Sequence, residues 1–250
     1  MSKKEISFLS LFNKNKPIIG MIHLKGSDRL KVLKRAIMEI NLYIENEIDA
    51  IIVENYFGDR YDVEQVLKEL YQNKKEITYG VNILGDYVKA FDLANKYKAD
   101  FIQVDSIVGH LNKTEDEIFD NKIKNLTINS DSFLIGGVRF KYQPYLSKRT
   151  LKEDLIIGMN RCNAIVVSGE GTGIETELMK IKKFRKIIGD FPLIIGAGLT
   201  ANNCEEQLEI ADAGIVGSYL KTNYKDYGEV SIKNTREFMN KVKKLRKDKI

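Results

Sequence analysis

The stretch PLIIGAGLTANNCEEQLEIADAGIVGSYLK, from Pro192 to Lys221, decides the fold class. It contains two short apolar runs, Pro192–Ala197 and Ala213–Gly217, separated by a longer polar segment. Apolar, β-branched runs of this length are typical of parallel strands that are buried on both faces. Each run ends in a glycine-containing loop, and such loops at the carboxyl ends of strands are where α/β proteins bind ligands.

Six further runs of the same kind precede this stretch, with no underlying sequence repeat. They alternate with longer segments whose apolar residues recur at three- and four-residue spacing, which indicates amphipathic helices. The other predicted strands are Pro17–Leu24, Asp49–Glu54, Ile77–Ile83, Asp100–Asp105, Ser132–Val138 and Asn163–Ser168. The predicted helices are Leu30–Glu47, Val63–Gln72, Asp86–Tyr97, Thr114–Ile128, Leu151–Asn160 and Glu177–Ile188.

Eight strands, each followed by a helix, favour an α/β fold with a single (β/α)8 TIM barrel. The competing architecture is an open, doubly wound sheet. It is disfavoured because no GxGxxG motif follows the first strand, where the sequence reads HLKGSD. A length of 250 residues fits one barrel domain. We expect residues 1–15 to be a lead-in and residues 231–250 to form a C-terminal helix with a basic end.

Composition narrows the class of protein further. Hydrophobic residues at 43% and charged residues at 30% are ordinary for a soluble globular chain and exclude a disordered one. The net charge of +5 is spread over many helices, and no aromatic residue follows Phe238 among the C-terminal lysines, so we expect no nucleic-acid partner. Cys162 and Cys204 form no CxxC motif, which disfavours a disulfide framework or a zinc site. Without a signal peptide or an 18-residue apolar run, we expect a cytoplasmic protein with no membrane span. A homodimer is expected on base rates alone.

Polar residues close most of the predicted strands, where the active site of a barrel lies. We expect catalytic roles for His23, Glu54, Asn82, Asp105 and Lys141. Buried charges at such positions are costly unless they pair or serve a ligand. The alternative is structural: a salt-bridged ring of Glu54, Asp105 and Lys141 that holds the barrel mouth together, and a His23 that only fills the core. No metal residue is assigned, although Glu54 and Asp105 offer oxygen ligands suited to Mg²⁺.

The glycine-rich loops after the last three strands predict a phosphate site. Glycine lets the backbone approach a ligand closely and present its N–H groups, and a helix N-terminus behind it favours an anion. The alternative is that these glycines only permit tight turns. The expected phosphate- or ligand-binding residues are Asn55, Arg139, Ser168, Thr172, Gly196, Gly198, Gly217 and Ser218.

Six segments, in order along the chain, resemble the BtpA/SgcQ family of barrels. They are KPIIGMIHL (Lys16–Leu24), DAIIVENYFGD (Asp49–Asp59), GVNIL (Gly80–Leu84), ADFIQVD (Ala99–Asp105), IIGAGLT (Ile194–Thr200) and ADAGIVGSYLK (Ala211–Lys221). The resemblance implies a phosphate-binding type of barrel. It also implies that the following residues face a ligand: His23, Glu54, Asn55, Asn82, Lys141, Thr172 and Gly198.

The chain departs from that family at three places. The first loop, KGSDR, lacks the usual proline-glycine stretch, and Asp105 stands where the family tends to have asparagine. Arg139 and Tyr142 flank Lys141 where an aspartate and a histidine are usual, so the pocket is expected to be more cationic and to suit a more anionic ligand.

Two functions remain open from the sequence. The first is an enzyme acting on a phosphorylated sugar or nucleoside-like metabolite by isomerisation, epimerisation, carbon–carbon cleavage or hydrolysis. Glu54 or Asp105 would then be the general base, and Lys141 would stabilise an oxyanion or form a Schiff base. The second is a non-catalytic assembly or regulatory factor, as the association of some family members with photosystem I accumulation suggests.

Overall fold

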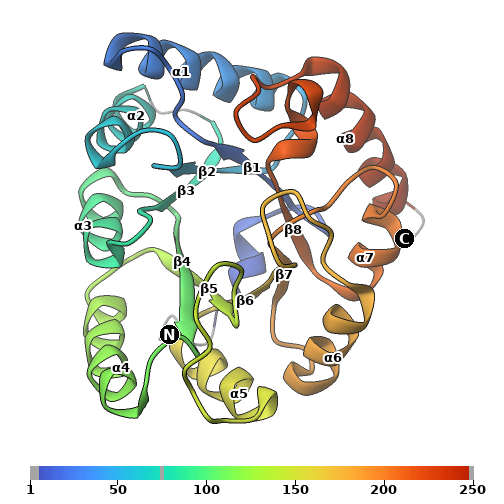
Figure 1. Cartoon of the computed structure of the whole chain (residues 1–250). Helices are drawn as coiled ribbons and strands as arrows, with labels where there is room; N and C mark the ends of the chain where they lie inside the picture. The colour runs from blue at the N-terminus through green and yellow to red at the C-terminus, as the bar shows by residue number, and fades with distance from the viewer. Residues whose placement is uncertain (1–5, 74–75, 248–250) are drawn as a thin grey trace.

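All eight predicted strands form, and they close into one parallel barrel (Figure 1). A computed structural model describes residues 6–73 and 76–247. Each strand pairs with the next one along the chain, and β8 closes the barrel by pairing with β1. The predicted (β/α)8 TIM barrel is therefore confirmed. The strands are β1 (Ile18–Ile22), β2 (Ala50–Glu54), β3 (Thr78–Asn82), β4 (Phe101–Val108), β5 (Phe133–Val138), β6 (Ala164–Val167), β7 (Leu193–Ile195) and β8 (Ala213–Val216).

Strand β4 is the one that extends beyond its predicted run. It continues past Asp105 to Val108, and its register against β5 shifts between Val104 and Val108. Such irregularities are frequent beside functional sites, because they redirect a side chain. Asp105 therefore lies within an irregular part of the strand instead of at its end.

The helices cover the outside of the barrel (Figure 1). Five of them begin after a residue whose side chain caps the first turn. Asp59, for example, caps the helix that begins at Arg60, three residues before its predicted start. The short helix at Cys204–Ile210 is an addition to the predicted set. The helices are α1 (Arg29–Glu45), α2 (Arg60–Gln72), α3 (Tyr87–Tyr97), α4 (Lys113–Ile128), α5 (Leu151–Arg161), α6 (Leu178–Ile188), α7 (Cys204–Ile210) and α8 (Ile232–Lys247).

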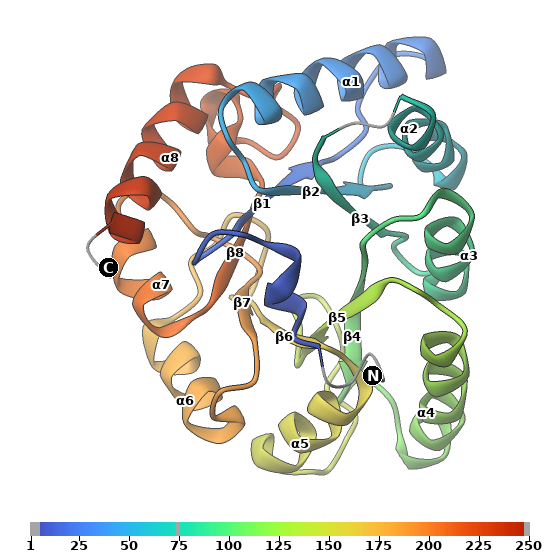
Figure 2. The same ribbon diagram turned by 180° about the vertical axis from the view of Figure 1, so that it is seen from behind.

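The lead-in fills the amino-terminal end of the barrel. Its 3-10 turn, η2 (Phe8–Leu11), crosses the barrel opening in the view from behind (Figure 2). Phe8 is fully buried and lies edge-on to Phe101 and Phe133, with ring centroids 5.6 and 6.1 Å away. This end is therefore sealed by apolar packing, which leaves the carboxyl ends of the strands as the accessible mouth.

The C-terminal helix α8 is fastened to the lead-in. Arg246 forms an ion pair with Asp49, and its Nε donates to the carbonyl of Asn15 at 2.8 Å. The last turn carries Lys244 and Lys247, as expected for a basic end, and residues 248–250 lie outside the described part of the chain. Within residues 6–73 and 76–247, no helix has the length and apolarity needed to cross a bilayer.

Candidate functional site

A cavity of about 180 Å³ opens at the carboxyl ends of the strands, and we call it the mouth cavity. Most of the residues predicted from the sequence lie around it, although they come from seven different βα units. Those that line it are His23, Glu54, Asp105, Lys141, Thr172, Gly196, Gly198, Gly217 and Ser218. Asn55, Asn82, Arg139 and Ser168 lie outside its lining and have other contacts, described below.

Two carboxyl groups share one amide at the floor of the mouth cavity. The register of β2 against β3 places Asn82 beside Glu54. Asn82 Nδ2 donates to Glu54 Oε1 at 2.8 Å and to Asp105 Oδ1 at 2.9 Å, and Gln103 Nε2 donates to the same Asp105 oxygen at 3.0 Å. Asn82 thus orients both carboxyl groups from behind.

Glu54 is protonated at neutral pH. It is 6% exposed, and this burial, together with the negative charge of Asp105, raises its pKa to about 8. Lys141 and the Asn82 hydrogen bond act in the opposite direction without cancelling the effect. A neutral acid beside a second carboxyl group is an arrangement that enzymes use for proton transfer.

His23 is a neutral imidazole whose tautomer is fixed. Burial, followed by the charge of Lys221, lowers its pKa well below 6.5. Its Nδ1 lies 2.9 Å from the carbonyl of Asp226, which can only accept, so the proton is on Nδ1 and Nε2 is an acceptor. Nε2 is 3.9 Å from Glu54 Oε2. Because both groups are neutral near pH 7, this contact is an acid facing a base and not an ion pair.

Lys141 lies on the opposite side of the cavity, on the loop after β5. Its Nζ donates to Thr172 Oγ1 at 3.2 Å, and its backbone N–H donates to Ser168 Oγ at 3.0 Å. Among the described residues it forms no ion pair with Glu54 or Asp105, so the salt-bridged ring considered above does not form. The ammonium group therefore remains directed at the cavity.

The loop after β6 is tied across the mouth by two tyrosines. Tyr142 Oη accepts from the backbone N–H of Thr172 at 2.7 Å. Tyr56 Oη lies 3.5 Å from Thr172 Oγ1 and donates to Asp226 Oδ2 at 3.1 Å, and the Tyr56 ring stacks on His23 with centroids 4.7 Å apart. These contacts join the loops after β2, β5, β6 and β8 into one rim.

Gly198, after β7, and Gly217, after β8, differ in whether the surrounding structure leaves room for a side chain. Gly198 has a φ of +70°, and a Cβ there would lie 2.2 Å from the Ile174 carbonyl oxygen, so backbone packing explains it. Gly217 has a φ of −114°, and a Cβ there would be 3.4 Å from His23. A Cβ at Gly217 thus meets only ordinary van der Waals contacts, so close packing does not require a glycine there. Among the described residues, the N–H groups of Gly217 and Ser218 donate no hydrogen bond.

The other predicted site residues support loops. Asn55 Oδ1 accepts from the backbone N–H of Leu84 at 2.7 Å, which fixes the loop after β3. Ser168 is fully buried and holds the Lys141 backbone as described above. Arg139 has a φ of +49°, and its Nε donates to Asp154 Oδ2 at 3.0 Å. Its guanidinium is therefore occupied by an aspartate on α5.

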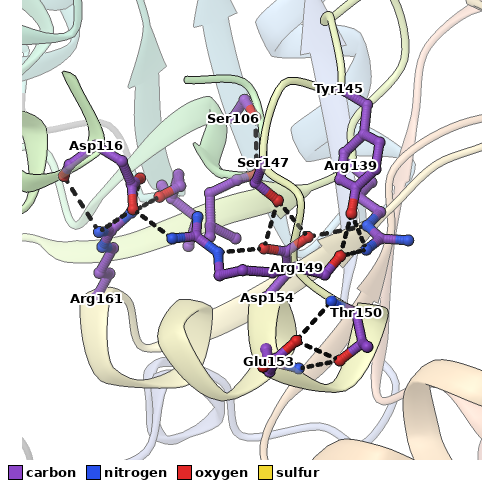
Figure 3. Close-up of polar contacts among 12 residues, drawn as sticks. Ser106, Asp116, Arg139, Tyr145, Ser147, Arg149, Thr150, Glu153, Asp154 and Arg161 are labelled. Atoms are coloured by element: carbon purple, nitrogen blue, oxygen red, sulfur yellow. Dashed lines mark hydrogen bonds and ion pairs between the residues drawn. The ribbon is translucent and has the colours of Figure 1, made fainter. Parts of the chain in front are cut away.

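Asp154 is the centre of a buried polar network behind that loop (Figure 3). It is fully buried and accepts from Arg139, from Arg149 Nε at 2.9 Å and from Ser147 Oγ at 3.0 Å. Arg149 continues to Asp116 on α4 at 2.9 Å, and Arg161 on α5 binds the same aspartate at 2.8 Å. The network fixes the segment that carries Lys141.

Lys221 does not line the mouth cavity, but it shares a hydrogen-bond partner with His23, and the sequence did not predict this role. It is fully buried, and burial lowers its pKa to about 8. Its Nζ donates to the Asp226 carbonyl at 3.1 Å, the same oxygen that accepts from His23. The available signal was a charged residue shortly after an apolar strand, in the motif GSYLK.

Metal binding at the mouth would depend on the carboxyl pair. The described residues hold no group of three or more His, Cys, Asp or Glu side chains suited to a metal ion. Glu54 and Asp105 are the oxygen ligands expected for Mg²⁺, and the amide hydrogens of Asn82 lie between them. In the structure, the two carboxyl groups are each hydrogen-bonded to this amide.

Fold and mouth together define the class of protein: a (β/α)8 barrel with titratable groups gathered at the carboxyl ends of its strands. Among solved structures, one described as native KDPGal matches 94% of this chain and 98% of its own with a TM-score of 0.66. The two share 11% sequence identity, so this likeness shows the fold alone.

The particular family follows from sequence comparison: the chain belongs to the BtpA family, whose model matches residues 14–244. An uncharacterised protein of Pyrococcus horikoshii is 30% identical over 93% of this chain and 98% of its own length. The photosystem I biogenesis protein BtpA of Synechocystis is 25% identical over 84% of this chain and 82% of its own. The resemblance inferred from the six segments is thereby confirmed.

Proposed function

We propose that this protein is an enzyme that binds a phosphorylated sugar or nucleoside-like metabolite and moves a proton on it at the barrel mouth. One observation carries the proposal. The neutral acid Glu54 and its partner Asp105 are held by one amide at the floor of a cavity, and the same cavity is bordered by the open backbone of Gly217 and Ser218. Proton donors and acceptors in such pairs serve isomerases, epimerases and lyases.

Each group has a proposed role that its position supports. The N–H groups of Gly217 and Ser218 would bind phosphate, since they have no internal acceptor among the described residues. Lys141 would stabilise an enolate or alkoxide from the opposite wall. Glu54 would donate its proton to one atom of the ligand, and His23 Nε2 would accept the proton that another atom of the ligand releases. His23 would then pass this proton to the Glu54 carboxylate, whose Oε2 lies 3.9 Å from Nε2, so both groups return to their starting states.

Ligand binding is tested by thermal shift with inorganic phosphate and a panel of sugar phosphates, with and without magnesium. A ligand at one hundred times its dissociation constant stabilises the fold by about 2.7 kcal/mol. We expect such a shift for the wild-type protein and its loss in Gly217→Asp, whose carboxylate repels phosphate. Gly217→Ala is the matched control for folding, because the structure leaves room for a Cβ. A panel without any shift would refute phosphate binding.

Catalysis is tested by exchange of carbon-bound hydrogen in deuterium oxide, followed by NMR on each sugar phosphate that binds. We expect exchange with the wild-type protein and at least a hundredfold slower exchange with Glu54→Gln, in line with the usual contribution of a general acid of about 10²–10⁴-fold. Binding without exchange would contradict an enzyme of this type.

A second candidate is an assembly or regulatory factor, and one observation favours it. The Synechocystis relative carries the name photosystem I biogenesis protein. This candidate predicts that Glu54→Gln retains the biological role, whereas the proposed enzyme loses it. Complementation of a deletion strain with the two forms separates the alternatives.

A further inference from the structure

A second cavity, of about 690 Å³, lies beside the mouth cavity, between α4 and the loop after β3. We call it the side cavity. It shares Leu84, Gln103, Asp105 and Tyr142 with the mouth cavity. Because Asp105 borders both spaces, one ligand can extend from the glycine loops past the carboxyl pair and into the side cavity.

The walls of the side cavity suit a flat apolar group. Tyr87 and Phe119 meet edge to face with ring centroids 5.2 Å apart, and His110 lies edge-on to Phe119 at 5.3 Å. Ile118 also lines the cavity and is 66% exposed, so its side chain is accessible to a ligand in this cavity. Aromatic walls of this kind bind planar rings by offset or edge-on packing.

The side cavity also contains polar atoms that have no hydrogen-bond partner among the described residues. Gln103 Nε2 donates to Asp105, and this contact fixes the orientation of the amide. Its Oε1 is buried and has no partner among the described residues, and the same is true of His110 Nδ1. Burial lowers the pKa of His110, so its ring is neutral. Buried polar atoms rarely remain unpaired, so Gln103 Oε1 and His110 Nδ1 are available to accept a hydrogen bond in this cavity.

We propose that the side cavity binds a planar, nitrogen-containing aromatic group of the same molecule whose phosphate binds at the glycine loops. The ring would pack on Tyr87 and Phe119 while its N–H group donates to Gln103 Oε1. This inference rests on the proposed function and narrows the substrate to a sugar phosphate that is N-linked to an aromatic ring. The linkage then lies beside Asp105, between the two cavities.

The test compares ribose 5-phosphate with its N-linked derivatives by isothermal titration calorimetry. The derivatives are nicotinamide mononucleotide and the common ribonucleoside 5′-monophosphates, and the free rings are measured alone. We expect at least one derivative to bind about tenfold more tightly than ribose 5-phosphate, or about 1.4 kcal/mol. Ile118→Glu should remove this gain, because it places a charge on the apolar wall. Ile128→Glu is the matched control, since Ile128 is 80% exposed on the same helix and outside both cavities.

The possible results separate this inference from the proposed function. Equal binding of ribose 5-phosphate and all derivatives, or a gain that survives in Ile118→Glu, overturns the aromatic subsite while phosphate binding stands. Free rings that bind in an Ile118-dependent manner, with no binding of any phosphate compound, refute the phosphate anchor and support the aromatic subsite alone.

Discussion

Replacing Glu54 with glutamine should change how the stability of the protein depends on pH. Burial and the charge of Asp105 raise the Glu54 pKa from 4.5 to about 8. A carboxyl group whose pKa is raised on folding stabilises the fold below its unfolded pKa, and this contribution is lost as the pH rises through the folded value. The relevant window is therefore from 4.5 to about 8.

The magnitude follows from the shift. Each pKa unit corresponds to about 1.4 kcal/mol, so ionisation of Glu54 removes about 5 kcal/mol across the whole window. As the pH rises from about 5.5 to about 9, we expect the free energy of unfolding of Glu54→Gln to increase by about 3 kcal/mol relative to that of the wild type. Glutamine keeps the shape and the Asn82 contact but never ionises.

Urea denaturation of both proteins across this range measures the difference directly. The readout is the difference in the free energy of unfolding between the two proteins at each pH. The wild-type values alone are not sufficient, because other groups titrate in both proteins. Glu209→Gln on the exposed side of α7 is the matched control, since it removes no buried carboxyl group. Asp105→Asn should move the Glu54 window to lower pH, because it removes the neighbouring charge. A difference between Glu54→Gln and wild type that stays constant from about pH 5.5 to about pH 9 would refute a raised Glu54 pKa.

Three further predictions concern groups outside the carboxyl pair. Asp154→Asn should destabilise the fold by about 3–5 kcal/mol in urea denaturation, because it leaves the charges of Arg139 and Arg149 without their buried partner; a loss below about 1 kcal/mol would show that the network is not coupled. The free energy of unfolding of Lys221→Met, relative to wild type, should be higher at about pH 6 than at about pH 10. The reason is that a lysine whose pKa is lowered to about 8 destabilises the fold as the pH falls through that value. The opposite pH dependence would contradict the burial of Lys221 as a cation. Phe8→Ala should cost about 3–5 kcal/mol through the lost ring contacts, and an unchanged melting temperature would show that the lead-in does not seal the barrel.

The fold was predictable because its signals are local. Buried parallel strands such as Ala50–Glu54 read as uninterrupted apolar runs, and the helices between them carry a clear spacing of apolar residues. The start of α2 was placed too late because capping by Asp59 recruits three polar residues that lack the apolar spacing. The end of β4 was also misplaced, since its irregular register carries no pattern in the sequence.

The site was predictable where strand order alone brings residues together. Glu54 on β2 and Asp105 on β4 both contact Asn82 on the strand between them, because consecutive parallel strands are neighbours in the barrel. Contacts between distant segments leave no local signal in the sequence. The Asp226 carbonyl that fixes the His23 tautomer lies 203 residues from His23 along the chain. The same carbonyl accepts from Lys221, which places this lysine beside His23. Arg139 was expected near the ligand because it follows β5. In the structure the backbone of Arg139 is left-handed, and its guanidinium group is hydrogen-bonded to Asp154.

The sealing of the barrel by Phe8 has a consequence for synthesis on the ribosome. Phe8 emerges before its ring partners Phe101 and Phe133, which follow on β4 and β5. Strand β1 likewise has only one paired edge until β8 has been made. The segment that contains Phe8 and β1 thus stays without these partners until most of the barrel strands have been made, and the amino-terminal end of the barrel closes late in translation.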